Sequence, residues 1–197
     1  MKNIFFLLFL SVVISCSQQP KSIHQTESES KKNTPNVNLS GIQIGLDILL
    51  NEKIDLIKNK NIALVTNHSG VDSYGTPNYE RLMNEKDVHI KIIFSPEHGL
   101  FGEAAAGEKV EYDGQVKTLP EVVSLYGSNR KPTYQQMEGL DYIIYDIQDV
   151  GARFYTYITT LGLIMESASA ANVKVIVLDR PNPIKGKLIE GPILDLK

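Results

Sequence analysis

The stretch between residues 140 and 178 reads LDYIIY over 140–145, YTYITTLGLIMESASAA over 155–171 and VKVIVL over 173–178. The first and last of these runs have the length and the apolar character of buried β-strands. The long run between them is rich in Ala, Leu, Ile and Met and predicts a helix. A strand, a helix and a second strand in this order predict two parallel strands joined by a crossover helix. Strands of this apolar kind are typical of a parallel sheet covered by helices on both faces.

The same alternation of strands and helices extends toward the N-terminus. Two further short apolar segments predict strands over Asn61–Val65 and His89–Phe94. Three helix-like segments accompany them: Leu46–Lys58, Asn78–Asn84 and Leu119–Tyr126, the last with Pro120 in its first turn. We therefore expect an α/β fold, a Rossmann-like and mostly parallel sheet with helices on both faces, over residues 41–197.

The composition of the 197-residue chain is that of an ordinary globular protein, with 42% hydrophobic and 22% charged residues. It excludes collagen-like, coiled-coil and wholly disordered classes. The 20 Lys and Arg are balanced by 23 Asp and Glu, and no basic stripe could neutralise a phosphate backbone, so we expect no nucleic-acid partner.

Neither a cofactor nor a metal ion is predicted. No GxGxxG or GxxxxGK[ST] loop follows a predicted strand, which argues against a nucleotide site of those two kinds. The four histidines contain no pair at i,i+4 or HxH spacing, and the one cysteine cannot supply a multi-cysteine metal site.

Residues 1–16 have the pattern of a lipoprotein signal peptide. A short basic start precedes the apolar run Ile4–Ile14, which is too short to span roughly 30 Å of hydrocarbon. The run ends in Val13-Ile-Ser-Cys16, which resembles the bacterial lipobox, in which the cysteine is acylated. We expect a lipid anchor at Cys16. The alternative is a soluble secreted protein that is cleaved near Ser15.

Residues 17–40 are predicted to be a flexible tether. They are rich in Ser, Gln, Glu, Lys and Pro and contain no aromatic residue, so they cannot bury enough apolar surface to offset their chain entropy. A lipid followed by such a tether would hold the folded part near a membrane of the bacterial cell envelope, on its periplasmic or outer side.

Polar side chains follow each of the four predicted strands. They are Asn67 and His68 after the first, Glu97 and His98 after the second, Asp146, Gln148 and Asp149 after the third, and Asp179, Arg180 and Asn182 after the fourth. Ligands of open parallel sheets bind outside the carboxyl ends of the strands. We therefore expect these groups to converge on one crevice.

Several of these strand-end strings resemble the exo-β-N-acetylmuramidase (NamZ-type) family of peptidoglycan-recycling enzymes. The strings that carry the resemblance are VTNHSGVD (65–72), SPEHG (95–99), AGEKV (106–110), SLYG (124–127), DIQDVGARFYTY (146–157), DRPNP (179–183) and EGP (190–192). They occur in the expected order across residues 41–197. Phe101 departs from the pattern, because family members often carry an arginine shortly after the EHG string.

The resemblance implies a Rossmann-like N-terminal domain, followed by a second domain, with a sugar site in the cleft between them. It also implies release of terminal β-linked N-acetylmuramic acid from peptidoglycan fragments, so the expected partner is a peptidoglycan-derived amino sugar. The chain stops at Lys197, and we expect the C-terminal domain of the family to be absent from it. A truncated inactive remnant, an envelope sugar-binding module and a hydrolase of another envelope glycan are the alternative interpretations.

Glycoside cleavage usually requires two carboxyl groups, one of which protonates the leaving oxygen. Glu97 is the predicted acid or base, because it directly follows a strand and the family's SPEHG string holds the proposed catalytic glutamate. His98 is predicted to tune it, since imidazole donates and accepts protons near neutral pH. The alternative is that Glu97 is an exposed loop charge or a helix N-cap partner.

The remaining candidates are predicted to bind substrate. One aspartate of Asp146 and Asp149 would be the second carboxylate. Arg153 would hold the lactyl carboxylate of N-acetylmuramic acid in a bidentate fork, or would instead pair internally with Asp149 or Asp179. Four residues have both a sugar-binding and a structural interpretation. Asn67 and His68 would either contact the sugar or form a local turn. Tyr155 and Tyr157 would either stack on a sugar ring or pack in the domain. Three groups are predicted to contact sugar hydroxyls at the rim or the crevice wall: Gln148, Asp179 with Arg180, and Asn182.

Overall fold

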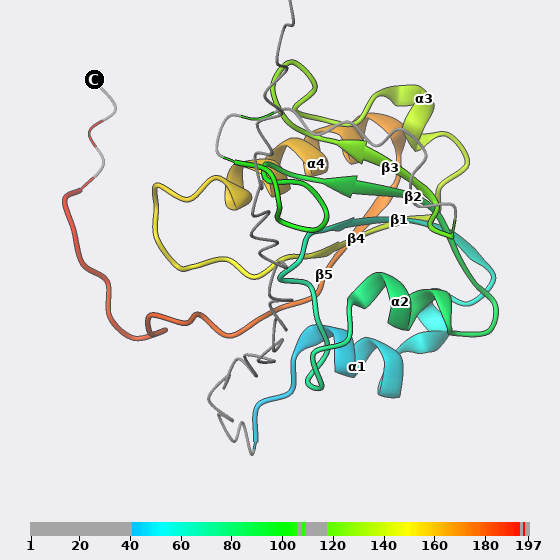
Figure 1. Cartoon of the computed structure of the whole chain (residues 1–197), viewed down its shortest axis with the longest axis horizontal. Helices are drawn as coiled ribbons and strands as arrows, with labels where there is room; N and C mark the ends of the chain where they lie inside the picture. The colour runs from blue at the N-terminus through cyan, green and yellow to red at the C-terminus, as the bar shows by residue number, and fades with distance from the viewer. Residues whose placement is uncertain (1–40, 106–107, 109–117, 194, 196–197) are drawn as a thin grey trace, which may run out of the picture. The chain divides into compact units, whose positions relative to one another are not determined.

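The computed structural model of the chain describes residues 41–105, 108, 118–193 and 195. Their five strands form one sheet in the order β3-β2-β1-β4-β5 (Figure 1). The strands are β1 Lys60–Thr66, β2 Val88–Ser95, β3 Glu121–Ser124, β4 Tyr142–Asp146 and β5 Lys174–Val177. Every neighbouring pair is parallel. The expected α/β fold with a Rossmann-like sheet is therefore confirmed.

Helices cover both faces of this sheet (Figure 1). One face carries α1 (Gly45–Glu52), the short 3-10 helix η1 (Ile54–Leu56) and α2 (Asn78–Met83), and the other carries α3 (Tyr134–Met137) and α4 (Tyr157–Ala171). Within β1, Ile62 and Leu64 belong to the core under α1 and α2, whereas Ala63 and Val65 belong to the core under α4. Successive side chains of a strand point to opposite faces. Burial on both faces therefore explains the unbroken apolar run.

The predicted helix over Leu119–Tyr126 is wrong. Glu121–Ser124 forms strand β3 at the edge of the sheet, in parallel register with Ile92–Ser95. Its two central valines are β-branched, which disfavours a helix and suits a pleated strand. Pro120 precedes the first strand residue, a position in which proline is tolerated. A strand of four residues carries too short a pattern to be recognised, and pairing with β2 decides its conformation.

One helix boundary and one additional helix also differ from the sequence expectation. Helix α1 stops at Glu52 instead of Lys58, and after η1 the backbone of Asn59 adopts a left-handed φ of 56°. A left-handed residue cannot continue a right-handed helix. The short helix α3 was not expected, and a capping box begins it: the hydroxyl of Thr133 accepts from the N–H of Gln136, whose side-chain oxygen accepts from the N–H of Thr133.

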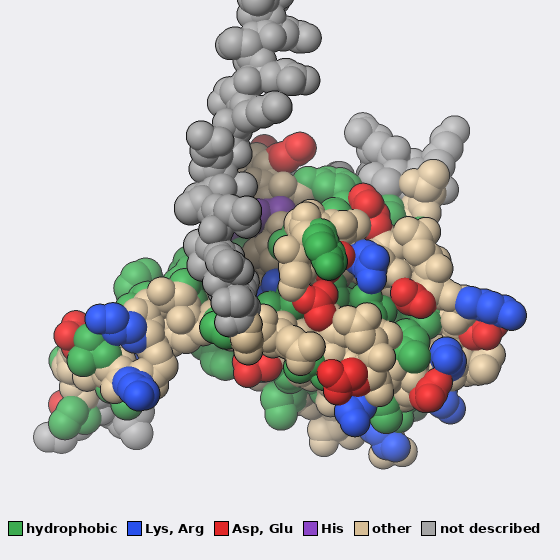
Figure 2. Space-filling model, turned by 90° about the horizontal axis from the view of Figure 1, so that it is seen from below, with side chains coloured by type: hydrophobic (Ala, Val, Ile, Leu, Met, Phe, Trp, Pro, Cys, Tyr) green, Lys and Arg blue, Asp and Glu red, His purple; other side chains and the backbone are tan. Residues whose placement is uncertain are grey.

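The predicted signal peptide, the lipidated Cys16 and the tether lie outside the described residues. Within the part of the chain that is described, no helix is long and apolar enough to cross a membrane. The face that carries α1 and α2 shows acidic and basic side chains intermixed (Figure 2).

Two glycines provide a matched test of the packing. A Cβ at Gly70, in the turn after β1, would collide with the side chains of Thr66 and Asn78 and lie 2.8 Å from the carbonyl oxygen of Asp146. A Cβ at Gly162, inside α4, would meet no atom within 4 Å. We expect Gly70→Ala to lower the free energy of unfolding by about 1–3 kcal/mol. Gly162→Ala should raise it by about 0.5–1 kcal/mol.

Denaturant unfolding of the two alanine variants, followed by circular dichroism, measures both effects against the unchanged chain. Equal stability of Gly70→Ala and the unchanged chain would show that the turn after β1 is not closely packed.

Candidate active site

The polar strand ends meet at one edge of the sheet. Thr66 of β1 pairs with Asp146 of β4, and Val65 pairs with Phe94 of β2. Tyr145 pairs with Val177, two residues before Asp179. In Figure 1 the loops that follow these strands gather at this carboxyl edge. The topology thus brings the predicted groups to one side of the domain, as parallel strand order requires.

A buried ion pair occupies the centre of this edge. Asp146 is fully buried, and the guanidinium of Arg180 donates to both of its carboxylate oxygens, from Nε at 2.7 Å and from Nη2 at 3.0 Å. Arg180 Nη2 also donates to the carbonyl oxygen of Val71 at 2.8 Å, and Asn78 Nδ2 donates to Asp146 Oδ2 at 2.8 Å. The pair therefore ties β4, the loop after β5 and the loop after β1 together.

This burial corrects the predicted sugar contact of Asp146, because its carboxylate has no exposed surface. The guanidinium group of Arg180 is engaged by Asp146 and Val71, and the residue also lines a cavity at this edge. A charged pair enclosed in this way holds the backbone in place, because separating either partner leaves an unpaired buried charge. The predicted sugar contact of Arg180 stays a prediction.

A second buried network surrounds Asn67. Its Nδ2 donates to the hydroxyl of Tyr157 at 2.8 Å, and its Oδ1 accepts from the N–H and the hydroxyl of Ser69. The Ser69 hydroxyl accepts from the N–H of Gln148 at 3.0 Å. Asn67 is only 1% exposed. The structural interpretation of Asn67, a local turn, therefore fits the geometry, and the predicted sugar contact does not.

The predicted tyrosines pack together. The rings of Tyr155 and Tyr157 meet edge to face with centroids 4.9 Å apart. Burial raises the pKa of Tyr157 to about 12, with Tyr155 adding to the rise and the hydrogen bond from Asn67 opposing it. The Tyr145 hydroxyl donates to the carbonyl oxygen of Tyr157 at 2.9 Å, and burial raises the Tyr145 pKa as well. Tyr157 is thus a packed side chain, whereas Tyr155 is partly exposed.

Glu97 stands on a tight turn at the end of β2. The N–H of Gly99 donates to the carbonyl oxygen of Pro96 at 3.1 Å, and His98 and Gly99 both have left-handed φ angles, 74° and 76°. A left-handed histidine is unusual and is found at functional turns as well as strained ones. Pro96 is buried and Glu97 is partly exposed. The turn therefore presents the Glu97 side chain at the surface of the carboxyl edge.

Both predicted histidines contact the loop that follows this turn, His98 from the turn itself and His68 from the segment after β1. His98 Nδ1 lies 3.0 Å from the carbonyl oxygen of Ala104, within the same loop. The ring of His68 packs directly against the backbone of Gly102, where any Cβ would collide with it. Gly102 also has a left-handed φ of 72°, so both the backbone conformation and the close approach of His68 require glycine there. The two imidazoles fasten the loop beside Glu97.

Glu97 lines a cavity of about 320 Å³ between the loop after β3 and the start of α4. Its other lining residues are Leu125, Tyr126, Arg130, Thr156, Thr159, Thr160 and Leu163. Desolvation raises the pKa of the Tyr126 hydroxyl, the charge of Glu97 and a hydrogen bond with it raise it further, and Arg130 lowers it. The hydroxyl of Tyr126 therefore lies within reach of the charges of both Glu97 and Arg130.

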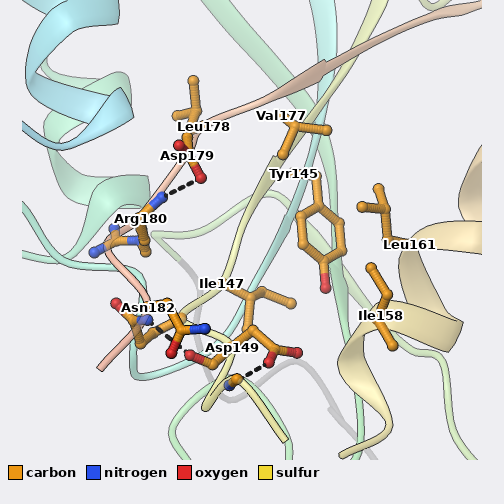
Figure 3. A pocket seen from close by; sticks show the side chains of 12 residues that line it. Tyr145, Ile147, Asp149, Ile158, Leu161, Val177, Leu178, Asp179, Arg180 and Asn182 are labelled. Atoms are coloured by element: carbon orange, nitrogen blue, oxygen red, sulfur yellow. Dashed lines mark hydrogen bonds between the residues drawn. The ribbon is translucent and has the colours of Figure 1, made fainter. Parts of the chain in front are cut away.

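A neighbouring cavity of about 210 Å³ contains most of the other predicted groups (Figure 3). Its walls include Gln148, Asp149, Asp179 and Asn182. Asp149 Oδ1 accepts from the N–H of Gly151 at 2.7 Å, and Asp179 Oδ1 accepts from the N–H of Arg180 at 3.0 Å, as Figure 3 shows. Gln148 Nε2 bridges the carbonyl oxygens of Asp149 and Pro181. Asp149 is partly exposed, unlike Asp146.

Arg153 lies apart from Glu97. It lines a third cavity, of about 420 Å³, with Asp149, Asn182 and the segment from Lys185 to Glu190. Its Nη1 donates to the carbonyl oxygen of Pro192 at 2.9 Å. Among the ion pairs of the described residues, none joins Arg153 to Asp149 or Asp179, so the predicted internal pairing is wrong. Its predicted contact with a lactyl carboxylate would lie away from the Glu97 cavity.

Tyr126 and Arg130 were not among the site residues predicted from the sequence, because residues 119–126 were predicted to form a helix. Had they been recognised as a strand, the rule that located the other candidates would have included the residues that follow Ser124. The three threonines at the start of α4 carry no such signal. Within residues 41–105 and 118–193, no three His, Cys, Asp or Glu side chains are placed to hold a metal ion together.

Comparisons with known proteins identify a matching family model and one curated relative. A family model described as the N-terminal part of exo-beta-N-acetylmuramidase NamZ matches residues 62–197. The peptidoglycan beta-N-acetylmuramidase NamZ of Bacillus subtilis (strain 168) is 39% identical over 189 residues, which are 96% of this chain and 43% of that protein. The chain therefore spans less than half of this relative's length.

Two solved structures have the same fold. They are crystal structures of DUF1343 family proteins from Bacteroides fragilis NCTC 9343, which match with TM-scores of 0.68 and 0.63 and are 37% and 35% identical. Each match covers 78% of this chain and 38% of the solved chain.

Proposed function

The chain belongs to the family of NamZ N-terminal domains. From this premise we propose that the cavity lined by Glu97 forms one wall of an exo-β-N-acetylmuramidase site. The proposed reaction is the hydrolysis of terminal N-acetylmuramic acid from peptidoglycan fragments. The observation that carries the proposal is the position of Glu97. A strained turn at the carboxyl end of β2 presents it, and it lines a cavity with hydroxyl groups and a guanidinium.

The chemistry of this wall suits proton transfer to a glycosidic oxygen. Among the described residues that line its cavity, Glu97 is the only carboxylate. Tyr126 lines the same cavity, and the charge of Glu97 is one of the causes that raise the pKa of its hydroxyl. Asp149 is the remaining candidate for the second carboxylate, since it is partly exposed at the same edge and Asp146 is enclosed.

In this proposal, residues 41–197 form the Rossmann-like N-terminal domain, and a second domain completes the cleft. An exo-acting glycosidase must enclose the terminal sugar to hold the leaving oxygen near its acid. The larger part of the Bacillus subtilis relative lies beyond the region it shares with this chain, and that part is a suitable source of the second wall.

The proposal is tested with a two-domain chimera, in which this chain is joined to the remaining part of the Bacillus subtilis relative. Chromogenic β-N-acetylmuramide and β-N-acetylglucosaminide are offered as substrates. We expect hydrolysis of the muramide and little of the glucosaminide. Binding of the muramide without hydrolysis would favour a sugar-binding module, and inactivity on both with no binding would reject the proposal.

We also propose that Cys16 carries a lipid and places the domain in the cell envelope. The support is the sequence of residues 1–16 and the acylated cysteine of the lipobox that it resembles. When the full chain is expressed in bacteria that receive labelled palmitate, we expect label in the protein. Cys16→Ala should abolish the labelling. Equal labelling of the variant would reject the anchor and favour cleavage near Ser15.

A further inference from the structure

The cavity beside Glu97 holds a guanidinium to which the sequence analysis assigned no role. Arg130 lines it from the loop after β3, together with the threonines at the start of α4. Its charge and that of Glu97 act in opposite directions on the pKa of the Tyr126 hydroxyl, which lines the same cavity. A positive group and the proposed acid therefore line one cavity.

The loop that carries Arg130 is held in place on both sides. Asn129 Nδ2 donates to the carbonyl oxygen of Ser124 at 3.2 Å, and Arg130 Nε donates to the carbonyl oxygen of Gly127 at 3.3 Å. The next residue, Lys131, forms an ion pair with Glu166 of α4 at 2.8 Å. These contacts fix the base of the Arg130 side chain relative to α4 and so to the far wall of the cavity.

The guanidinium head of Arg130 remains available to a ligand. Within the described part of the chain its Nη groups have no acceptor, and the residue is exposed. The other arginines are engaged: Arg81 with Asp72, Arg153 with Pro192 and Arg180 with Asp146. Arg130 is also the one arginine among the described residues that line the Glu97 cavity.

N-acetylmuramic acid differs from N-acetylglucosamine by a lactyl ether that ends in a carboxylate. A planar guanidinium binds a carboxylate through two parallel hydrogen bonds, which gives both energy and orientation. The carboxylate would otherwise face the negative charge of Glu97 in the same cavity, at an electrostatic cost. An available cation beside the acid removes this repulsion.

We propose that Arg130 binds the lactyl carboxylate of the terminal N-acetylmuramic acid and so selects this sugar over N-acetylglucosamine. The inference rests on the proposed function, and it transfers to Arg130 the role expected of Arg153. The hydroxyl groups of Thr156, Thr159 and Thr160 line the same cavity and are donors and acceptors for the hydroxyl and acetamido groups of the sugar.

The test is an NMR titration of the full chain with N-acetylmuramic acid and, separately, with N-acetylglucosamine. The side-chain Nε–H signals of the arginines report which guanidinium meets the ligand. We expect the Arg130 signal to move with N-acetylmuramic acid. Arg130→Gln should weaken binding of that sugar roughly 10- to 100-fold, the range of a hydrogen bond to a charged group. Binding of N-acetylglucosamine should remain unchanged.

Arg153→Gln is the matched control, because it removes an exposed arginine from another cavity at the same edge. It should leave the preference for N-acetylmuramic acid intact. Loss of the preference in Arg153→Gln, or its retention in Arg130→Gln, would overturn the assignment of Arg130.

The two-domain chimera separates this inference from the proposed function. Muramidase activity with an unaltered substrate preference in Arg130→Gln would overturn the inference and leave the function standing. If the unchanged chain binds neither sugar and the chimera hydrolyses neither substrate, the proposed function fails and the inference fails with it.

Discussion

Glu97→Gln should lower the turnover of the two-domain chimera on β-N-acetylmuramide by roughly 10²- to 10⁴-fold, the usual contribution of a general acid or base. Glutamine has nearly the shape of glutamate but cannot transfer the proton. The turn that presents residue 97 depends on the backbone bond from Gly99 to Pro96 and on the left-handed His98. Because the substitution leaves these features in place, we expect little change in sugar binding.

The measurement is steady-state hydrolysis of the chromogenic muramide, with substrate affinity followed in parallel. Glu103→Gln is the control, since Glu103 is an exposed carboxylate in the loop that follows the same turn. It should retain normal turnover. Near-normal turnover of Glu97→Gln would reject Glu97 as acid or base and transfer the assignment to Asp149, which is partly exposed at the same edge.

Arg180→Met should have the largest effect on stability, a loss of roughly 3–5 kcal/mol in the free energy of unfolding. It leaves the fully buried Asp146 carboxylate without its cation, and only Asn78 still donates to it from a side chain. The side chain of Arg180 is only 7% exposed, so solvent cannot replace the lost partner. For a domain of this size, the melting temperature should fall by about 6–20 °C.

Denaturant and thermal unfolding of the full chain measure this loss. Arg153→Met provides the control, because it removes an arginine from the exposed surface of the same edge, and it should change stability by no more than about 0.5 kcal/mol. Adding Asp146→Asn to Arg180→Met removes the unpaired charge and should recover part of the stability. Equal effects of Arg180→Met and Arg153→Met would show that the buried pair does not hold the strand ends together.

The alternation of strands and helices was predictable because the residues that become buried form short apolar segments in the sequence. Strands β1, β2 and β4 have buried residues on both faces and β5 has partly buried ones, so each of the four has an apolar segment that identifies it without knowledge of its neighbours. The position of the site was predictable from the strand pattern as well, because the carboxyl ends of parallel strands lie at one edge of the sheet. Strand β3 was not predictable from the sequence, since only its pairing with β2 distinguishes it from a short helix.

The roles of the individual polar residues were decided by the tertiary structure. Asp146 and Asp149 stand in the same DIQD string, yet one is enclosed by Arg180 and Asn78 while the other reaches the surface. Arg130, Arg153 and Arg180 all follow strands in the chain, but one lines the Glu97 cavity, one binds a backbone carbonyl and one is buried. Residue type and position after a strand are local properties. Burial and charge pairing depend on segments that are distant in the chain, and these determine which carboxylate and which guanidinium remain available to a sugar.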